Sequence, residues 1–307
     1  MITLAGSASR YASGSRAENT TKAYTAAWTS FTDWCSRHDA EPMPANPATV
    51  ALYLTARADQ GMKVATLALA LAAIGAAHRA AGLEFNSKSP TLAAVWSGIR
   101  RQIGIRPTRK APVLTEDLRA MLGTLDRTTI AGKRDAALVL IGFGAALRRS
   151  ELVALNIEDV TVVAEGLKVL IRRSKTDQES AGAEIAIARG RSSITDPVAA
   201  FEAWVAAAGI LTGPLFRRVR RNGLVGHERL SGKSVADRVK LLAAAAGLDP
   251  ALYSGHSLRA GLATSAASAG AGLTSIMKQT RHKSVDVAAV YVRDVEMWRD
   301  NVSGLVL

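Results

Sequence analysis

Four segments of this sequence carry residues that could do chemistry. Two of them lie near the middle of the chain and carry basic side chains. Arg148 and Glu151 follow an apolar run and are three residues apart, which places them on one helical face where they can pair. Lys175 lies in the polar stretch 174–182, which is typical of a hairpin loop. Taken singly, such an ion pair is usually structural and such a lysine is usually solvated.

The other two segments lie toward the C-terminus and add two histidines, an arginine and a tyrosine. His256 and Arg259 are three residues apart in a predicted first helical turn, whose free backbone N–H groups favour an anion. His282 and Tyr291 are nine residues apart further along the chain. A lone tyrosine usually has no chemical role, so only the combination of the four segments indicates an active site.

This combination of residue types suits a reaction at a phosphodiester. Arginine forks match phosphate oxygens in geometry and stay charged, and a tyrosine hydroxyl becomes a nucleophile when a base accepts its proton. The sequence lacks the phosphate-binding glycine loop, the zinc-protease helix motif and the serine-hydrolase elbow. Its five histidines form no metal-ligand pair at helical spacing. We therefore expect neither a metal nor another cofactor.

Charge and composition point to the partner. The chain has 307 residues, with 39 Lys and Arg against 26 Asp and Glu, and a net charge of +13. Such a surplus favours a polyanion, with nucleic acid ahead of a membrane. Cys35 is the single cysteine, so no intrachain disulfide can form, which fits a reducing cytoplasm. The sequence shows neither a signal peptide nor an apolar run of the roughly 20 residues that span a bilayer.

The element pattern predicts a mainly α fold in two domains, with a small antiparallel β-sheet in the second. Residues 1–15 resemble a flexible arm, 16–105 a helical domain, and 106–112 a basic linker with two prolines. An aromatic stripe in the helical domain is expected to form its core: Tyr24, Trp28, Phe31 and Trp34. Strands are predicted at 160–163, 167–172 and 184–188, and helices prevail from Pro197 onward, with a last one over about 294–307. Two basic domains and a basic joint suggest a C-shaped clamp around a DNA duplex.

The four segments in this order resemble the tyrosine recombinase (phage integrase) family, in its Cre-type and Xer-like branches. The family's motif order falls on Arg148, Lys175, His256, Arg259, His282 and Tyr291. The resemblance covers 113–307 as the catalytic domain, and 16–105 only as a helical core-binding, SAM-like domain. Two residues depart from the family's pattern: Arg149 stands where an apolar residue is usual, and Lys283 stands where a small residue is usual. Both departures are mild, because neither removes a catalytic group.

The resemblance implies a role for each of these residues. Arg148 and Arg259 would bind the non-bridging phosphate oxygens, and Tyr291 would attack to give a covalent 3′-phosphotyrosine. The expected proton acceptor is His256, the expected phosphate hydrogen-bond donor is His282, and the expected acid for the departing 5′-oxygen is Lys175. Glu151 would orient Arg148 or the histidines.

The resemblance also implies an activity and partners. It predicts a site-specific recombinase that breaks and rejoins DNA without metal or ATP, exchanging strands through a Holliday junction. Its partner would be a double-stranded site with inverted arms, bound by a homo-tetramer in which the C-terminal helix docks on the neighbouring protomer. Two alternatives stay open: a DNA-binding protein of this fold without strand exchange, and DNA relaxation like that of a type IB topoisomerase. The C-terminal helix could also pack on its own protomer.

The side chains that contact DNA outside the active site are harder to predict. Basic residues in and after the helical domain, together with one at the start of the catalytic motif, are the candidates: Lys63, Arg100, Arg101, Arg106, Arg109, Lys110 and Arg149. Phosphate contacts position a protein on DNA, whereas contacts with base edges specify the sequence. The sequence does not separate the two among these residues.

Overall fold

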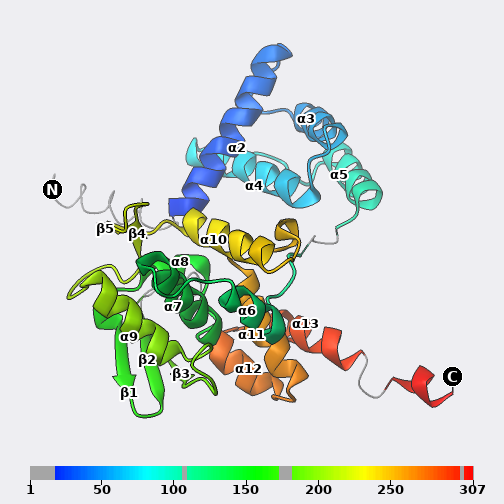
Figure 1. Cartoon of the computed structure of the whole chain (residues 1–307). Coiled ribbons are helices and arrows are strands. Elements are labelled where there is room, and N and C mark those ends of the chain that lie inside the picture. Colours follow the sequence, from blue (N-terminus) through cyan, green and yellow to red (C-terminus); the bar gives the residue numbers. More distant parts are fainter. Residues whose placement is uncertain (1–17, 106–108, 173–181, 298–300, 307) are drawn as a thin grey trace. The chain divides into compact units, whose positions relative to one another are not determined.

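The computed structural model describes residues 18–105, 109–172, 182–297 and 301–306 (Figure 1). By their internal contacts the residues divide into two compact units, Met1–Thr108 and Arg109–Leu307. The division falls inside the segment 106–112. Helices dominate both units, and within the described ranges strands occur only in the second, where they pair antiparallel. The predicted fold class, mainly α with a small antiparallel sheet, is confirmed.

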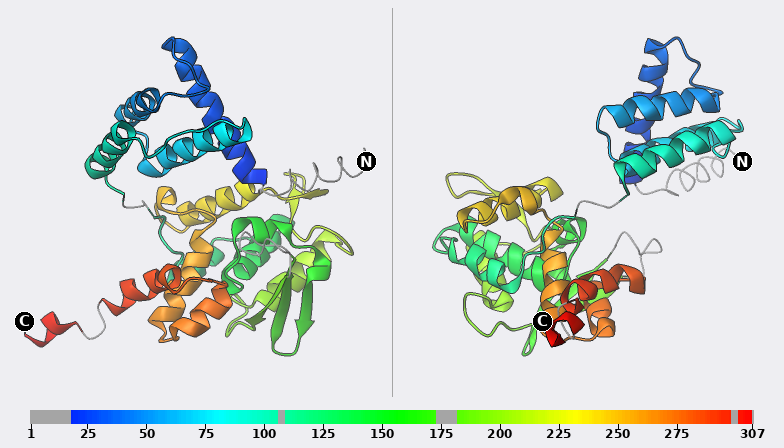
Figure 2. Two further views of the ribbon diagram at one scale, coloured as in Figure 1. Left: turned by 180° about the vertical axis from the view of Figure 1, so that it is seen from behind. Right: turned by 90° about the vertical axis from the view of Figure 1, so that its right-hand side faces the viewer.

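The first unit is built from four described helices (Figures 1 and 2): α2 (Glu18–Arg37), α3 (Pro47–Asp59), α4 (Val64–Ala80) and α5 (Pro90–Ile103). Helix α2 packs on α4, and α3 packs on α5. Two of the helices begin at an Asx or Ser cap followed by proline, a pattern that the sequence displays: the Asn46 and Ser89 side chains accept hydrogen bonds from the first-turn N–H groups of Ala48 and Leu92.

Aromatic side chains form the core of this unit, as predicted for three of the four residues of the stripe, whereas Tyr24 is half-buried and is not part of the core cluster. Phe31 is fully buried and Trp34 nearly so, while Trp28 packs against them from the edge. The Phe31 and Tyr53 rings meet edge-on at 5.1 Å between centroids. Cys35 lies in the same core as a free thiol, and burial raises its pKa.

The second unit alternates helices with short strands. Its described elements are α6 (Thr115–Gly123), α7 (Ile130–Gly144), α8 (Arg149–Ala154), η1 (Ile157–Asp159), β1 (Val160–Val163), β2 (Gly166–Ile171), β3 (Ala183–Ala188), α9 (Pro197–Ala208), β4 (Arg217–Val219), β5 (Val225–Arg229), α10 (Gly232–Ala245), η2 (Pro250–Leu252), α11 (Ser257–Ser268), α12 (Leu273–Thr280), α13 (Val285–Glu296) and η3 (Val302–Leu305). Helix α7 runs through the middle of this unit and is buried almost throughout, between α9 and α11. Both of its neighbours are therefore fixed against one rigid element.

The strands β1, β2 and β3 form one antiparallel sheet in that order (Figures 1 and 2). All three lie within one residue of the predicted strands. Burial alternates along β2 and β3, which gives them a period of two, but it does not alternate along the four-residue β1. A second, two-stranded sheet of β4 and β5 was not predicted, and the expectation that helices prevail after Pro197 is wrong there. Its strands are short and rich in arginine, so they show no apolar alternation.

The second half of the expected linker is an integral part of the second unit. Ala111 donates its N–H to Leu252 O at 2.8 Å, and the fully buried Val113 donates to Ser257 O at 2.9 Å. Gly261 on α11 makes this approach possible, because a Cβ there would lie 1.9 Å from the Val113 carbonyl oxygen.

The C-terminal end differs from the single helix expected over 294–307. Helix α13 ends at Glu296, and the described residues 301–306 contain only the 3-10 helix η3. Asn301 starts this turn anew, since its side chain accepts a hydrogen bond from the Ser303 N–H at 2.9 Å.

Candidate active site

The turn between α7 and α8 positions the first arginine. Ala146 has φ +47°, a left-handed conformation that reverses the chain after α7. Arg148 then caps α8, and its Nη1 forms an ion pair with Glu151 Oε1 at 2.7 Å. Glu151 Oε2 also accepts the Arg148 backbone N–H at 2.9 Å. The carboxylate is almost completely buried, so it holds both the main chain and the guanidinium of Arg148.

The start of α11 contributes the second arginine. Arg259 is 1% exposed, and its Nη1 donates to Ala146 O at 2.6 Å. Its Nη2 is buried and has no hydrogen-bond partner among the described residues, which marks it as a donor available to a ligand. Burial, followed by the charges of Arg148 and Arg281, lowers the pKa of Arg259 to about 10. Arg259 is therefore still cationic at neutral pH.

His256 lies at the N-terminus of the same helix with its side chain exposed. Desolvation by the surrounding protein and the guanidinium groups of Arg259 and Arg148 lower its pKa. The imidazole is therefore neutral at physiological pH, which is the form that can accept a proton.

The segment from α12 to α13 brings the second histidine to the tyrosine. The His282 and Tyr291 rings are stacked, with centroids 5.8 Å apart and planes at 15°. Thr280 Oγ donates to Ile276 O at 2.7 Å and lies 2.8 Å from His282 Nδ1. Since the hydroxyl proton is committed to the carbonyl, Nδ1 must carry the imidazole proton, and Nε2 keeps its lone pair.

The same surroundings lower the pKa of His282 to about 4, through burial first and then the charges of Arg259 and Arg148. The neutral ring accepts a hydrogen bond at Nε2. The expected donation from His282 to a phosphate therefore requires the ring to be protonated when the anion is bound.

Sequence reasoning missed one cation of this cluster, Arg281. Its Nη2 forms a 2.7 Å ion pair with Glu151 Oε2, so that Glu151 bridges two guanidinium groups. Its Nη1 donates to Ala145 O at 3.0 Å. The sequence signal for Arg281 was its basic side chain directly before His282, at a position to which the motif assigns no role.

Five of the six predicted catalytic residues thus lie in one cluster, with Glu151 at its base: Arg148, His256, Arg259, His282 and Tyr291. Lys175 and Arg106 lie outside the described residues. Lys175 belongs to the connection between the antiparallel strands β2 and β3.

The other predicted DNA contacts are spread over the two units. In the first unit, Lys63 precedes α4, and Arg100 and Arg101 are in the last turn of α5. In the second, Lys110 donates to Ala251 O at 2.6 Å, whereas Arg149 is exposed and its aliphatic stem packs on Gly232 and Gly255. Arg109 is exposed beside Lys110.

A second arginine cluster, here called the hairpin groove, lies between the β4–β5 hairpin, α7 and the start of α10. Its volume is about 670 Å³, and six arginines are among the residues that line it: Arg134, Arg218, Arg220, Arg221, Arg229 and Arg238. Arg134 is buried against Asp135, while Arg218, Arg220 and Arg221 are exposed. The run of arginines at 217–221 could have revealed this groove from the sequence.

The described residues contain neither a candidate metal site nor a candidate membrane-spanning helix. No cluster of three or more histidine, cysteine, aspartate or glutamate side chains there could hold a metal ion. None of the described helices combines the length and the apolar character needed to cross a membrane.

Comparison with known proteins identifies the family. The sequence model of the phage integrase family matches residues 113–296. An integrase/recombinase XerD homolog of Selenomonas ruminantium is 39% identical over 290 residues, which cover 94% of this chain and 85% of the relative. The recombinase Cre of Escherichia phage P1 is 26% identical, covering 91% of this chain and 85% of Cre. The chain belongs to the phage integrase family of tyrosine recombinases, which break and rejoin DNA.

Solved structures share the fold. A lambda integrase dimer bound to a COC′ core site superposes with a TM-score of 0.63 at 17% identity, over 95% of this chain and 76% of that one. The XerH site-specific recombinase bound to a palindromic difH substrate gives 0.62 at 16% identity, over 85% and 72%. Both neighbours are complexes with DNA.

Proposed function

We propose that this protein is a site-specific recombinase that cleaves DNA through a covalent 3′-phosphotyrosine at Tyr291 and exchanges strands through a Holliday junction. The observation that carries this proposal is the convergence of Arg148, Arg259 and two neutral histidines beside Tyr291. Membership of the family supports the breaking and rejoining of DNA. The strand exchange would serve integration, excision or resolution of a mobile element or replicon.

The two arginines are suited to the charge that develops during transesterification. As the Tyr291 oxygen bonds to phosphorus, negative charge grows on the non-bridging oxygens and the bond to the 5′-oxygen breaks. Arg259 offers its unpartnered Nη2 to this charge, and Arg148 is held in place by Glu151. Donors fixed in advance stabilise such a state by about 3–4 kcal/mol each, because they need no reorganisation.

Proton transfer is assigned to His256 and Lys175, which would act at the attacking and the departing oxygen of the phosphate. His256, neutral because of its lowered pKa, accepts the Tyr291 proton as the bond to phosphorus forms. His282 holds the Tyr291 ring by stacking, and a bound phosphate favours its protonated, donating form. Lys175 gives a proton to the departing 5′-oxygen. Because the phosphotyrosine conserves the energy of the broken bond, rejoining needs no ATP.

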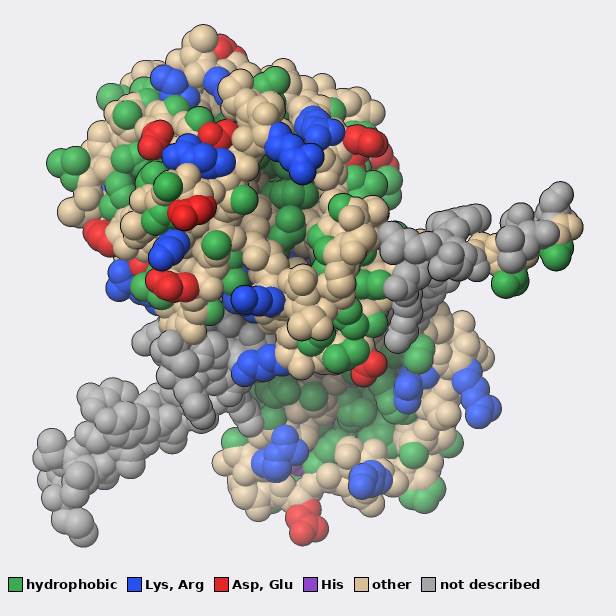
Figure 3. Space-filling view, turned by 90° about the horizontal axis from the view of Figure 1, so that it is seen from below, with side chains coloured by type: hydrophobic (Ala, Val, Ile, Leu, Met, Phe, Trp, Pro, Cys, Tyr) green, Lys and Arg blue, Asp and Glu red, His purple; other side chains and the backbone are tan. Residues whose placement is uncertain are grey.

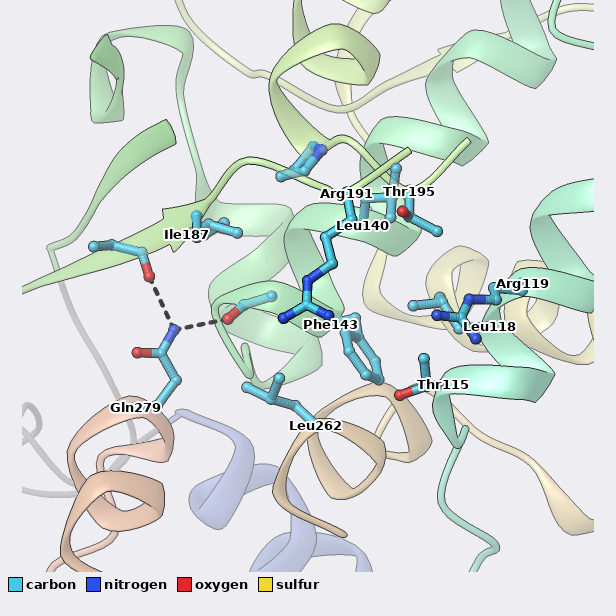
Figure 4. Close-up of a pocket in the computed structure, with 14 residues that line it drawn as sticks. Thr115, Leu118, Arg119, Leu140, Phe143, Ile187, Arg191, Thr195, Leu262 and Gln279 are labelled. Carbon is cyan, nitrogen blue, oxygen red and sulfur yellow. Dashed lines mark hydrogen bonds between the residues drawn. The ribbon is translucent and has the colours of Figure 1, made fainter. Parts of the chain in front are cut away.

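Tetramer formation through the C-terminal segment is the second part of the proposal. A hollow of about 460 Å³ in the second unit is lined mainly by apolar side chains of α6, α7, β3 and α11 (Figure 4), among them Leu118, Phe143, Ile187 and Leu262. Apolar side chains are visible on the C-terminal segment (Figure 3), where Val302 and Val306 are 72% and 82% exposed. We infer that this segment occupies the hollow of a neighbouring copy, which makes a head-to-tail ring.

Double-stranded DNA is the proposed partner, and its phosphates would lie along the basic side chains outside the active site. The exposed arginines of the hairpin groove add to the predicted contacts, because the guanidinium fork binds phosphate in a bidentate manner. A cytoplasmic location fits the buried free thiol of Cys35.

Covalent trapping tests the proposal directly. Wild-type protein and Tyr291→Phe are incubated without metal with nicked duplexes from the protein's genetic neighbourhood, and the products are separated on a denaturing gel. We expect a denaturation-resistant protein–DNA band with wild type and none with Tyr291→Phe. An equal band with both proteins would move the nucleophile elsewhere. Tight binding without a band, on the duplex that the protein selects from the pool, would favour the alternative of DNA binding without strand exchange.

A further inference from the structure

Arg281 has an unusual backbone conformation for its residue type. It follows the last turn of α12 with φ +56° and ψ +42°, in the left-handed region. That region is unfavourable for any residue with a Cβ, and glycine or asparagine is the usual choice there. A long cationic side chain in such a place persists only when its contacts offset the strain. The contacts of Arg281 are therefore informative.

All but one of these contacts go to the segment that carries Arg148; the exception is a 3.4 Å donation from Nη1 to Gln279 O, and Nε is buried with no hydrogen-bond partner among the described residues. Arg281 Nη2 pairs with Glu151 Oε2 at 2.7 Å, and Nη1 donates to Ala145 O at 3.0 Å. Its side chain is 12% exposed. Glu151 is thereby divided between two cations, with Oε1 on Arg148 and Oε2 on Arg281.

Three successive carbonyl groups before Arg148 are held in the same way. Gly144 O accepts from Gln279 Nε2 at 2.8 Å, and Ala145 O accepts from Arg281. Ala146 O accepts from Arg259 Nη1 at 2.6 Å. The turn between α7 and α8 is thus fixed by side chains from α11 and from the end of α12. Among these side chains, Arg281 also contacts Glu151 and directly precedes His282.

We propose that Arg281 is a positioning residue of the active site, which locks the His282 segment to Glu151 and the turn before Arg148. With Oε2 engaged by Arg281, Glu151 presents a single oxygen to the Arg148 guanidinium, and the remaining donors of Arg148 stay available for phosphate. Without Arg281, Glu151 Oε2 keeps only the backbone N–H of Arg148, so the carboxylate holds the Arg148 guanidinium less firmly, and His282 loses its tether. This inference rests on the proposed cleavage by Tyr291.

The informative variant is Arg281→Gly, because glycine adopts the left-handed conformation without strain and the turn is kept. Its readouts are the single-turnover rate of covalent complex formation at saturating nicked duplex, and the Kd for intact duplex. We expect the rate to fall by about 10- to 100-fold, since a small misplacement of catalytic groups has effects of this size. The Kd should change by less than about threefold, because exposed cations dominate affinity.

Two further measurements separate positioning from folding. Added guanidinium ion should restore part of the rate of Arg281→Gly, whereas Arg281→Lys should stay slow because an ammonium lacks the planar fork. The matched control is Arg127→Ala. Arg127 lies away from the active site, and its Nη2 donates a hydrogen bond to Ile194 O at a distance of 2.6 Å. We expect this control to melt at a lower temperature and to cleave at the wild-type rate.

Several outcomes would overturn the proposal. A wild-type cleavage rate in Arg281→Gly would exclude it, as would a loss of rate that guanidinium does not restore and that follows a loss of folded protein. If wild type forms no adduct that depends on Tyr291, the proposed function fails first, and this inference fails with it.

Discussion

The second unit contains two clusters of arginines that differ in what holds them. In the active-site cluster, Arg259 is 1% exposed, and Arg148 and Arg281 share the buried Glu151. In the hairpin groove, Arg220 and Arg221 are exposed on a short β-hairpin. The same residue type is thus held by buried partners in the active-site cluster, whereas at Arg220 and Arg221 it is exposed to solvent.

This difference separates two uses of a guanidinium group. A buried arginine with fixed partners offers its remaining donor in one direction, which stabilises a transition state. An exposed arginine adds charge that attracts a polyanion and that salt screens readily. We therefore expect substitutions in the first cluster to change rates, and substitutions in the second to change affinity and its dependence on salt.

Among substitutions in the two arginine clusters, the largest effect is expected for Arg259→Ala. Removing its buried donor should slow covalent complex formation on a nicked duplex by roughly 100- to 1,000-fold, with little change in duplex affinity. The variant should also unfold more readily, because Ala146 O loses its 2.6 Å donor and keeps only the 3.4 Å hydrogen bond from Arg281 Nη2. Single-turnover kinetics at saturating DNA, on protein shown to be folded by circular dichroism, measures the rate. A loss confined to affinity would erase the contrast between the clusters.

The double variant Arg220→Ala, Arg221→Ala tests the other side of the comparison. If both side chains contact phosphates, the slope of log affinity against log salt should become shallower by about two units. The cleavage rate at saturating DNA should stay at the wild-type value. Filter binding over a salt series gives the slope, and an unchanged slope removes both residues from the DNA interface.

A smaller effect is expected for Thr280→Val, which keeps the shape of the side chain and removes the oxygen beside His282 Nδ1. Without that acceptor the proton is no longer held on Nδ1, so the ring loses its fixed tautomer. We expect cleavage to slow by about 10-fold, in line with the loss of a partner that orients a catalytic histidine. Its pH–rate profile should change in shape, whereas a purely structural defect would lower the whole curve.

The smallest effect concerns stability in acid. The pKa of His282 is about 4 in the folded protein, against about 6.5 in an unfolded chain. Between these values the unfolded state binds more protons, so stability falls as the pH is lowered from 6.5 to 4. His282→Gln should remove about 1 kcal/mol of this fall, allowing for the partial exposure of the ring. Urea unfolding at pH 7 and pH 4.5 measures it, and parallel losses in both proteins would contradict the expectation.

Much of the fold could be predicted because its signals are local. The caps Asn46 and Ser89, and the alternating burial of β2 and β3, depend on residues within a few positions of one another. The β4–β5 hairpin was missed because its arginines obey no apolar period. The C-terminal turn at Asn301 was missed because an apolar spacing was taken for a continuous helix.

The candidate site could be predicted as a set of residues but not as a geometry. Motif order identifies Arg148, Arg259 and Tyr291, yet the bridging of Glu151 by Arg281 joins positions 130 residues apart. The proton on His282 Nδ1 follows from Thr280 and Ile276 O, a contact that spacing alone does not reveal. Long-range contacts of this kind exist only once the helices have packed.

The anchoring of residues 110–113 has a mechanical consequence. The chain that arrives from the first unit is fastened at Ala251, Leu252 and Ser257, on both sides of the segment that holds His256. The backbone on both sides of His256 is therefore tied directly to the strip of chain at 110–113, so the placement of the imidazole depends on how that strip is seated.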